Sequence, residues 1–246
     1  AIMQFIFADT LDPSIAKLNL NESKQAKTSL YDLQIDPANP GLRFHRVERA
    51  RGPNFWSIRV NRDVRIIIHR TDKSFVVCYA DHHDKAYKWA ENRKGMVHPK
   101  TGAFQFVKIR ELVEDIVIRR VVEEIPSANP IFESIPSDTL LAHGVPEEWL
   151  QDVMTVTDED DLLAIVEHLP VEASDALLEL ATGGSPAEPT FDQEFTNPFE
   201  HPDAKRRFYV LEETGDDSLA HFLDQPLSVW RFFLHPSQRT IVENNW

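Results

Sequence analysis

Three strand-like runs follow one another with almost no intervening chain, and they limit the fold more than any other feature. FWSIRVN, VRIIIHR and FVVCYAD occupy residues 55–61, 64–70 and 75–81 and are rich in β-branched and aromatic residues. Only Arg62-Asp63 separates the first two runs, and TDKS separates the second from the third. Connections this short permit hairpins but not crossovers, so the sequence predicts an antiparallel meander.

Shorter elements flank this meander on both sides. MQFIFAD predicts a strand, DPSIAKLN a short helix, and residues 22–33 a second helix with Ala26, Leu30 and Leu33 on one face. RFHRVERA predicts a further strand, joined to the meander by the turn RGPN. A helix from Asp84 to about Arg93 closes the unit. These patterns indicate an α+β fold, an antiparallel sheet with packing helices.

Strand alternation assigns the two faces of the meander. Ile58, Ile66 and Ile68, with Trp56 and Val60, are predicted to supply the core. Arg59 and Arg65 then point to the opposite face, together with Ser57, Ile67 and His69. We therefore expect a cationic face on this sheet.

The segment YADHHDKAYKWAENRK, residues 79–94, spans the passage from the last strand into the helix. Ala86, Trp89 and Ala90 recur at helical spacing and indicate packing on the sheet. A metal site at His82 and His83 is disfavoured, because adjacent strand residues point to opposite faces and no zinc-type spacing occurs. The remaining hypotheses are a structural junction and an acid/base site that faces nucleic acid.

Composition divides the chain into segments of different character. We predict a first domain over residues 3–94 and a linker with a strand and a helix over 95–136. An acidic all-α helical connector over 137–184, a flexible linker over 185–204 and a small α/β tail segment over 205–246 complete the prediction.

Charge is distributed unevenly along the sequence. Residues 1–120 hold 21 Lys and Arg against 14 Asp and Glu, whereas residues 121–246 hold 5 against 26. A basic first domain suits the phosphates of DNA or RNA, and the acidic helices suit a protein partner. The alternative is that both are ordinary solvated surfaces.

The chain shows no sign of a membrane or an oxidising compartment. No window approaches the roughly 18 apolar residues of a membrane span. Cys78 is the single cysteine, and its place within an apolar strand pattern indicates a core residue. We expect a cytoplasmic protein without a membrane partner.

The run FWSIRVNRDVRIIIHR followed by FVVCYADHHDKAYKWAENR resembles the RelE/ParE toxin superfamily, over roughly residues 3–94. Members have a small α/β fold with an antiparallel sheet. RelE-like members cleave messenger RNA on the ribosome, and ParE-like members act on DNA gyrase. The resemblance therefore implies either a nuclease or a module that docks on a protein.

The same resemblance implies roles for five residues. Arg59 and Arg65 match the sheet cations that hold phosphate, and His82 and His83 fall where further cationic or acid/base groups lie. Tyr87 lies near the place of a terminal aromatic residue. In such enzymes a ribose 2′-OH attacks the adjacent phosphate, which requires a proton acceptor, a proton donor and cations.

The chain also departs from the family pattern. Ser57 occupies one of two places that hold paired lysines, and the unit opens a much longer chain than a free-standing toxin. Three hypotheses stay open: a module that positions nucleic acid or a partner, an active RNase, and a module that docks on an antitoxin-like protein.

The tail FLHPSQRTIVENNW resembles the segment before the phosphate loop of UvrD/Rep-type superfamily 1 DNA helicases. There a Leu-x-x-x-Gln element reads adenine, and Leu234 to Gln238 match it. Gln238 would therefore contact the adenine of ATP, and ATP and Mg²⁺ are implied for a full-length helicase. The sequence has no GxxxxGK[ST]. We interpret the chain as the N-terminal region of such a helicase, with the helicase core of the same protein as a partner.

Overall fold

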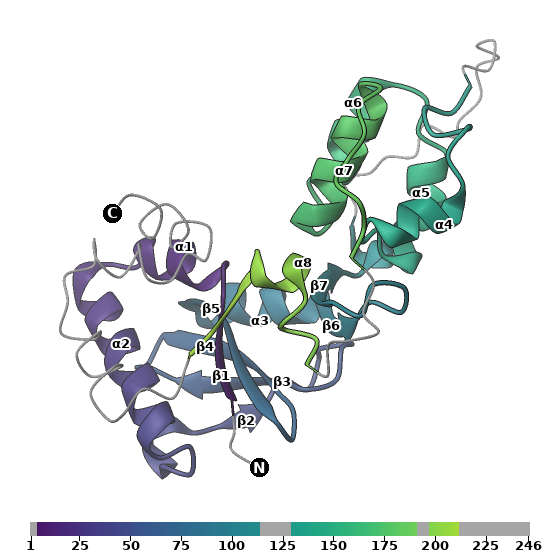
Figure 1. Ribbon diagram of the computed structural model, residues 1–246. Helices are drawn as coiled ribbons and strands as arrows, with labels where there is room; N and C mark the ends of the chain where they lie inside the picture. Colours follow the sequence, from purple (N-terminus) through teal and green to yellow (C-terminus); the bar gives the residue numbers. More distant parts are fainter. Residues whose placement is uncertain (1–3, 114–128, 191–196, 212–246) are drawn as a thin grey trace, which may run out of the picture. The chain divides into compact units, whose positions relative to one another are not determined.

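The structure is a computed structural model that describes residues 4–113, 129–190 and 197–211. Within these ranges the chain divides into two compact units, the first of residues 4–93 with 205–211 and the second of residues 94–204 apart from the gaps. Figure 1 shows the elements of both units. Across the described residues, no helix combines the length and apolar character needed to cross a membrane.

The first unit is an α+β structure, as predicted, and its strands form a mixed sheet in the order β2-β3-β4-β5-β1-β8. Its elements are β1 (Gln4–Ala8), α1 (Leu11–Ala16), α2 (Leu20–Ile35), the 3₁₀ turn η1 (Pro40–Leu42), β2 (His45–Arg46), β3 (Phe55–Arg59), β4 (Val64–Arg70), β5 (Ser74–His82), α3 (His83–Glu91) and β8 (Phe208–Val210).

A capping box starts α2. The Asn19 side chain accepts a hydrogen bond from the backbone N–H of Glu22 at 2.8 Å, and the Glu22 carboxylate accepts one from the N–H of Asn19 at 3.3 Å. These bonds satisfy two donors that a helix start leaves without an intrahelical partner. The helix therefore begins at Leu20, slightly earlier than its apolar pattern predicts.

The predicted meander is confirmed, but the fully antiparallel sheet is wrong. β3, β4 and β5 pair antiparallel, with Ser57 opposite Ile67 and Ile67 opposite Tyr79. β1, in contrast, pairs parallel to β5 in the register Phe5 to Phe75. Helices α1 and α2 carry the chain from β1 to the far edge of the sheet, so no hairpin forces β1 to run antiparallel.

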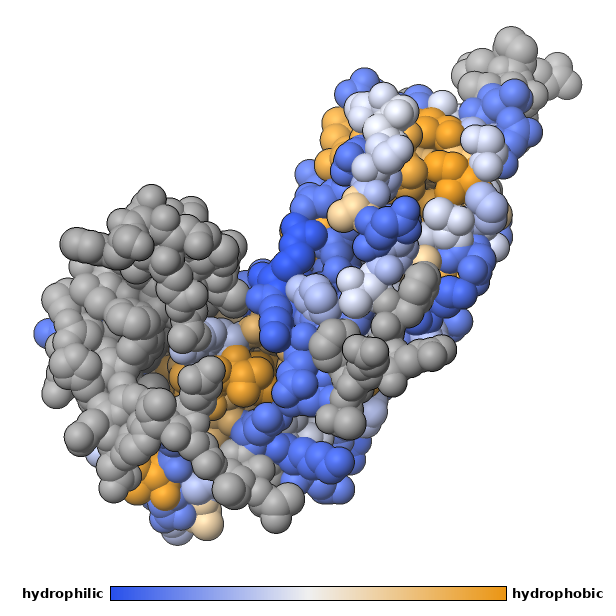
Figure 2. All heavy atoms as spheres, in the orientation of Figure 1, coloured by the Kyte–Doolittle hydropathy of each residue, from blue (hydrophilic) through white to orange (hydrophobic). Residues whose placement is uncertain are grey.

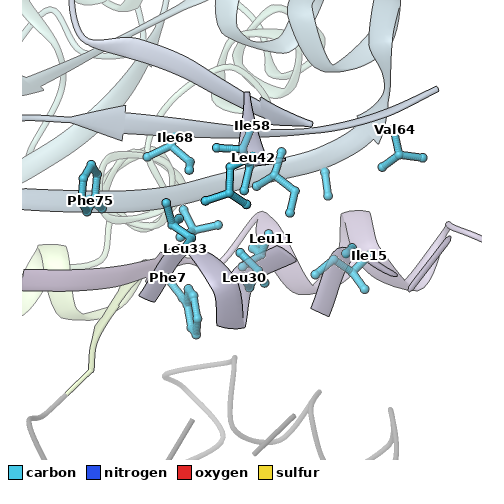
Figure 3. Close-up of a cluster of buried hydrophobic side chains, with 14 of the residues drawn as sticks. Phe7, Leu11, Ile15, Leu30, Leu33, Leu42, Ile58, Val64, Ile68 and Phe75 are labelled. Atoms are coloured by element: carbon cyan, nitrogen blue, oxygen red, sulfur yellow. The ribbon is translucent and has the colours of Figure 1, made fainter. Parts of the chain in front are cut away.

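The main core lies between the sheet and helices α1 and α2. Figure 3 shows Leu30 and Leu33 of α2 gathered with Phe7, Ile58 and Ile68 of the strands. Ile58, Ile66 and Ile68 are fully buried, as the alternation predicted. Burial of such side chains contributes about 1.5–3 kcal/mol each, which makes this layer the main source of stability for the sheet.

The opposite face is not the open cationic surface that the sequence indicated. Ser57 and Ile67 are fully buried there, and His69 is nearly so. Helix α3 packs against β4 and β5 on this face. The Trp89 ring stacks on Tyr79 with centroids 5.4 Å apart and meets Phe55 edge-on at 6.0 Å. The apolar side of α3 needs a partner, and this face of the sheet supplies it.

The second unit combines a hairpin with short helices. Its elements are β6 (Arg93–Val97), β7 (Phe104–Lys108), the 3₁₀ turn η2 (Arg110–Leu112), α4 (Ser137–Ala142), α5 (Glu147–Met154), α6 (Glu159–Val166), α7 (Val171–Ala181) and α8 (Pro202–Lys205). Helices α4 to α7 lie within residues 137–184, the range for which the sequence predicted helices. The sequence assigned 95–136 and 185–204 to linkers, whereas their described parts belong to this compact unit.

A small core explains why these segments join the unit. Trp149 is fully buried in a cluster that contains Val107 of β7 and Leu177 of α7, and its indole N–H donates to the Lys108 carbonyl at 2.9 Å. Figure 2 shows orange hydrophobic residues among polar ones on the surface of this unit. Leu163 and Val171 are among those that stay exposed.

Residues 205–211 return to the first unit instead of starting a separate domain. β8 pairs antiparallel with β1, with Tyr209 opposite Phe7. The predicted adenine contact, Gln238, lies outside the described residues.

Candidate functional site

A pocket of about 640 Å³ lies between the segment that contains β2 and the exposed side of α3. Two arginines, two histidines and a tyrosine line it, together with carboxylates: the lining residues are His45, Arg46, Val47, Glu48, Arg49, His83, Asp84, Tyr87 and Glu91. All of them belong to the first unit. This pocket gathers acid/base, cationic and aromatic side chains in one place, so it is the candidate site.

The backbone before β2 orients the ring of His45. Arg43 follows η1 in a left-handed conformation with φ of 45°, which is uncommon for a residue other than glycine. Its carbonyl oxygen lies 2.7 Å from Nδ1 of His45. A carbonyl only accepts hydrogen bonds, so Nδ1 carries a proton, and in the neutral tautomer that has its proton there Nε2 is an acceptor.

The hydroxyl of Tyr87 meets that acceptor. Tyr87 Oη lies 2.7 Å from Nε2 of His45, and in the neutral tautomer with its proton on Nδ1 the tyrosine hydroxyl is the donor. Ser57 Oγ lies 3.1 Å from Tyr87 Oη and 3.3 Å from Nε2 of His45. In the register of β2 and β3, His45 stands directly opposite Ser57, which is how the sheet brings these two residues together.

His83 completes the aromatic side of the pocket. Its ring centroid lies 4.1 Å from that of Tyr87, one helical turn away on α3. Its Nδ1 donates to the Asp84 carboxylate at 2.9 Å. His83 and Tyr87, both predicted from the sequence, therefore do lie together in the candidate site.

His82 points elsewhere. Its Nε2 lies 3.0 Å from the Glu22 carboxylate at the start of α2, and this hydrogen bond raises the pKa of His82 above its ordinary value. Because His82 and His83 diverge, they share no ligand position. Among the described residues, no group of three or more His, Cys, Asp or Glu is arranged to hold a metal ion.

Arg59 and Arg65 hold the turn between β3 and β4. Nε of Arg59 donates to the Asn61 carbonyl at 3.0 Å, and Nη1 of Arg65 donates to the same oxygen at 2.9 Å. The two arginines are directly opposite in the strand register, but neither lines the pocket. The predicted phosphate-holding pair is thus present as neighbours and not as part of the candidate site.

Of the nine lining residues, only His83 and Tyr87 were among the predicted site residues, and the most important of those missed are one histidine and two arginines. His45, Arg46 and Arg49 come from RFHRVERA, which was interpreted only as a strand. The concentration of basic residues in that run is the signal that marks it. Its pairing with α3 was not readable, because β2 and α3 meet through the tertiary fold.

His69 and Cys78 are among the buried titratable groups that lie away from the pocket. Burial lowers the pKa of His69 to about 4, so this imidazole is neutral near pH 7. Burial also raises the pKa of the Cys78 thiol far above its ordinary value. Cys78 is therefore a core residue, as predicted, with its thiol donating to the Val76 carbonyl at 3.1 Å.

Comparison with models of protein families finds no match, and neither does comparison with curated proteins. Among solved structures, a copper-bound mutant toxin from Helicobacter pylori is similar over 34% of this chain and 98% of that one. The sequence identity is 16% and the TM-score is 0.28. A likeness at that TM-score carries no argument about fold or function.

Proposed function

We propose that the first unit binds a single strand of nucleic acid in the pocket lined by His45, Arg49 and Tyr87. The observation that carries this proposal is the meeting of two exposed arginines with three aromatic rings at one pocket. Single strands are held by cations that track the phosphates and by rings on which bases stack. Arginine suits phosphate because its planar fork donates two parallel hydrogen bonds.

The charges within the pocket divide it into two sides. Arg46 and Arg49 come from β2 and the residues after it, with Glu48 as the one carboxylate on that side, whereas Asp84 and Glu91 come from α3. Phosphate is therefore expected beside the arginines. A nucleobase is expected to stack beside His83. The amino groups of the nucleobase would donate hydrogen bonds to the carboxylates on that side.

The test is binding of fluorescently labelled single-stranded DNA and RNA by anisotropy over a range of salt concentrations. The double variant Arg46→Ala/Arg49→Ala removes two phosphate contacts, which should reduce the slope of log K against log salt by about 1.4. Lys17→Ala/Lys24→Ala is the matched control, because both lysines are exposed on the α1–α2 side. Equal loss in both double variants would mean that binding is non-specific and does not use the pocket.

RNA cleavage is a second candidate, favoured by the hydrogen bond between His45 and Tyr87 inside the same pocket. Histidine is suited to proton transfer near neutral pH, and attack by a ribose 2′-OH needs such a group beside cations. End-labelled RNA is expected to be cut while the matching DNA stays intact. Loss of cleavage in His45→Gln, with retention in His82→Gln, supports this role; the reverse pattern contradicts it.

We also propose that this unit belongs to the N-terminal region of a UvrD/Rep-type helicase. The support is the sequence from Leu234 to Gln238, where Gln238 would contact adenine. In this setting the first unit positions nucleic acid for the motor. The chain itself is expected to hydrolyse no ATP in the presence of DNA, and measurable hydrolysis by it would contradict the setting.

A further inference from the structure

The hydrogen bonds in the pocket form an ordered chain that ends on a backbone carbonyl. Ser57 Oγ contacts Tyr87 Oη, Tyr87 donates to Nε2 of His45, and Nδ1 of His45 donates to the Arg43 carbonyl. A hydroxyl beside a base, with the base oriented by a third group, is the arrangement that activates a nucleophile. Two hydroxyls lie beside the base in this chain, and that of Tyr87 is the closer, at 2.7 Å from Nε2 against 3.3 Å for Ser57 Oγ.

The surroundings indicate what such a nucleophile would attack. Tyr87 is half-buried and lines the pocket, and its hydroxyl lies at the inner wall, between His45 and the buried Ser57. Arg46 and Arg49 line the same pocket and complement the charge of a phosphoryl group in the transition state. Acyl transfer would instead call for neutral donors around a carbonyl oxygen, and the paired cations favour phosphorus.

We propose that Tyr87 is a nucleophile toward phosphate esters, with His45 as its base and Arg46 and Arg49 as the groups that hold the phosphoryl oxygens. The Tyr87 Oη–P bond forms and one P–O bond of the ester breaks. The tyrosine proton passes to Nε2 of His45. The departing oxygen leaves on the side of phosphorus opposite the attacking oxygen and takes its proton from solvent, and the imidazolium later returns its proton to solvent, so no water is consumed. The product is a phosphotyrosyl ester and a free hydroxyl, with no further reactant consumed.

This chemistry differs from cleavage through a ribose 2′-OH in one decisive respect. The attacking oxygen belongs to the protein, so DNA and RNA are both substrates and the strand becomes attached to Tyr87. The inference rests on the proposed function only for the identity of the ester, a nucleic-acid strand. The reactivity of Tyr87 itself does not depend on nucleic-acid binding.

The first experiment uses the whole chain and a small alkyl fluorophosphonate, with labelled peptides identified by mass spectrometry. The other three tyrosines are internal controls, and Tyr79 is the sharpest of them, since its hydroxyl donates to the Asp81 carboxylate at 3.0 Å and not to an imidazole. Tyr87 is expected to be labelled fastest. His45→Gln should slow its labelling by about 100-fold, the usual contribution of a general base.

Two results would overturn the assignment. One is labelling of Tyr87 no faster than that of Tyr79, and the other is unchanged labelling of Tyr87 in His45→Gln. His45 is exposed on a two-residue edge strand, so His45→Gln is expected to keep the wild-type thermal unfolding curve. Measuring that curve checks that a slower labelling rate does not come from unfolding.

A second measurement separates this inference from the proposed function. A labelled single-stranded DNA is incubated with the chain and run on a denaturing gel, where a protein-linked band that Tyr87→Phe abolishes is expected. Fluorophosphonate labelling of Tyr87 without any DNA binding would retain the nucleophile and overturn the nucleic-acid substrate. DNA binding without labelling would retain the proposed function and overturn the nucleophile.

Discussion

Each unit contains a histidine whose ring is oriented by a backbone carbonyl, but one of these histidines lines a pocket and the other is a buried structural residue. In the first unit, Nδ1 of His45 donates to the Arg43 carbonyl, and Nε2 faces the Tyr87 hydroxyl in a pocket. In the second unit, Nε2 of His98 lies 2.8 Å from the Val145 carbonyl.

The second nitrogen makes the difference. Nδ1 of His98 accepts from the backbone N–H groups of Lys100 and Thr101, at 3.1 and 3.2 Å, and the residue is fully buried. Both ring nitrogens of His98 therefore bind backbone groups that link a loop to the helices, and neither is available for acid/base chemistry. The same residue type supports a site or a scaffold according to what its free nitrogen meets.

The largest expected effect is the difference in unfolding free energy between variants of His98 and of His45. His98→Ala leaves a cavity and removes the partners of two buried backbone groups and one partly buried one, so the free energy of unfolding should fall by about 3 kcal/mol. His45→Ala is at an exposed edge and should change it by less than about 0.5 kcal/mol. Denaturant titration of both variants measures this, and similar losses in the two would break the comparison.

The next effect is an acid sensitivity of the first unit. Burial lowers the pKa of His69 to about 4 in the folded state, against about 6.5 in the unfolded state. Below pH 6.5 the unfolded chain gains a proton on His69 that the folded chain does not bind. The free energy of unfolding is therefore highest above pH 6.5 and decreases by about 3 kcal/mol in total as the pH falls toward 4. Unfolding free energies measured from pH 7 to pH 4 should show this slope.

The matched control for that slope is His69→Leu, which has no titrating ring. Its unfolding free energy should vary less over the same range. Burial also lowers the pKa of His98, so the second unit should lose stability in the same direction below pH 6.5. A wild-type slope that His69→Leu leaves unchanged would contradict the assignment to His69.

A smaller effect compares one helix cap from each unit. Asn19 caps α2 of the first unit, and Asp158 caps α6 of the second by accepting from the Asp161 N–H at 2.8 Å. Asn19→Ala and Asp158→Ala should each cost about 1 kcal/mol. The Asp158 variant should cost slightly more, because its charge also favours the positive end of the helix. Thermal unfolding of the two variants is the measurement.

The smallest expected effect tests whether His82 is independent of the pocket histidines. Glu22→Gln keeps the capping-box geometry but removes the carboxylate that raises the pKa of His82. NMR titration should show the pKa of His82 falling back toward 6.5 while the signals of His45 and His83 stay in place. A coupled shift of His83 would place both histidines in one site.

Much of the fold could be predicted from local pattern. The meander of β3, β4 and β5 follows from β-branched runs joined by links too short for a crossover, and Ile58, Ile66 and Ile68 are buried as alternation requires. His83 and Tyr87 were both named from the family resemblance, and they lie together because they are one turn apart on α3. These features depend on contacts between residues close in the sequence.

Only the tertiary structure decided what the functional side chains meet. Whether Arg59 and Arg65 face an open surface depended on where α3 packs, and the parallel pairing of β1 depended on the path of two helices. His45 reaches Tyr87 across 42 residues of sequence. The sequence by itself determined the meander strands, the helices beside them and their apolar faces, because these depend on short-range periodicity. The candidate site depends on long-range packing between β2 and α3, which no local pattern encodes.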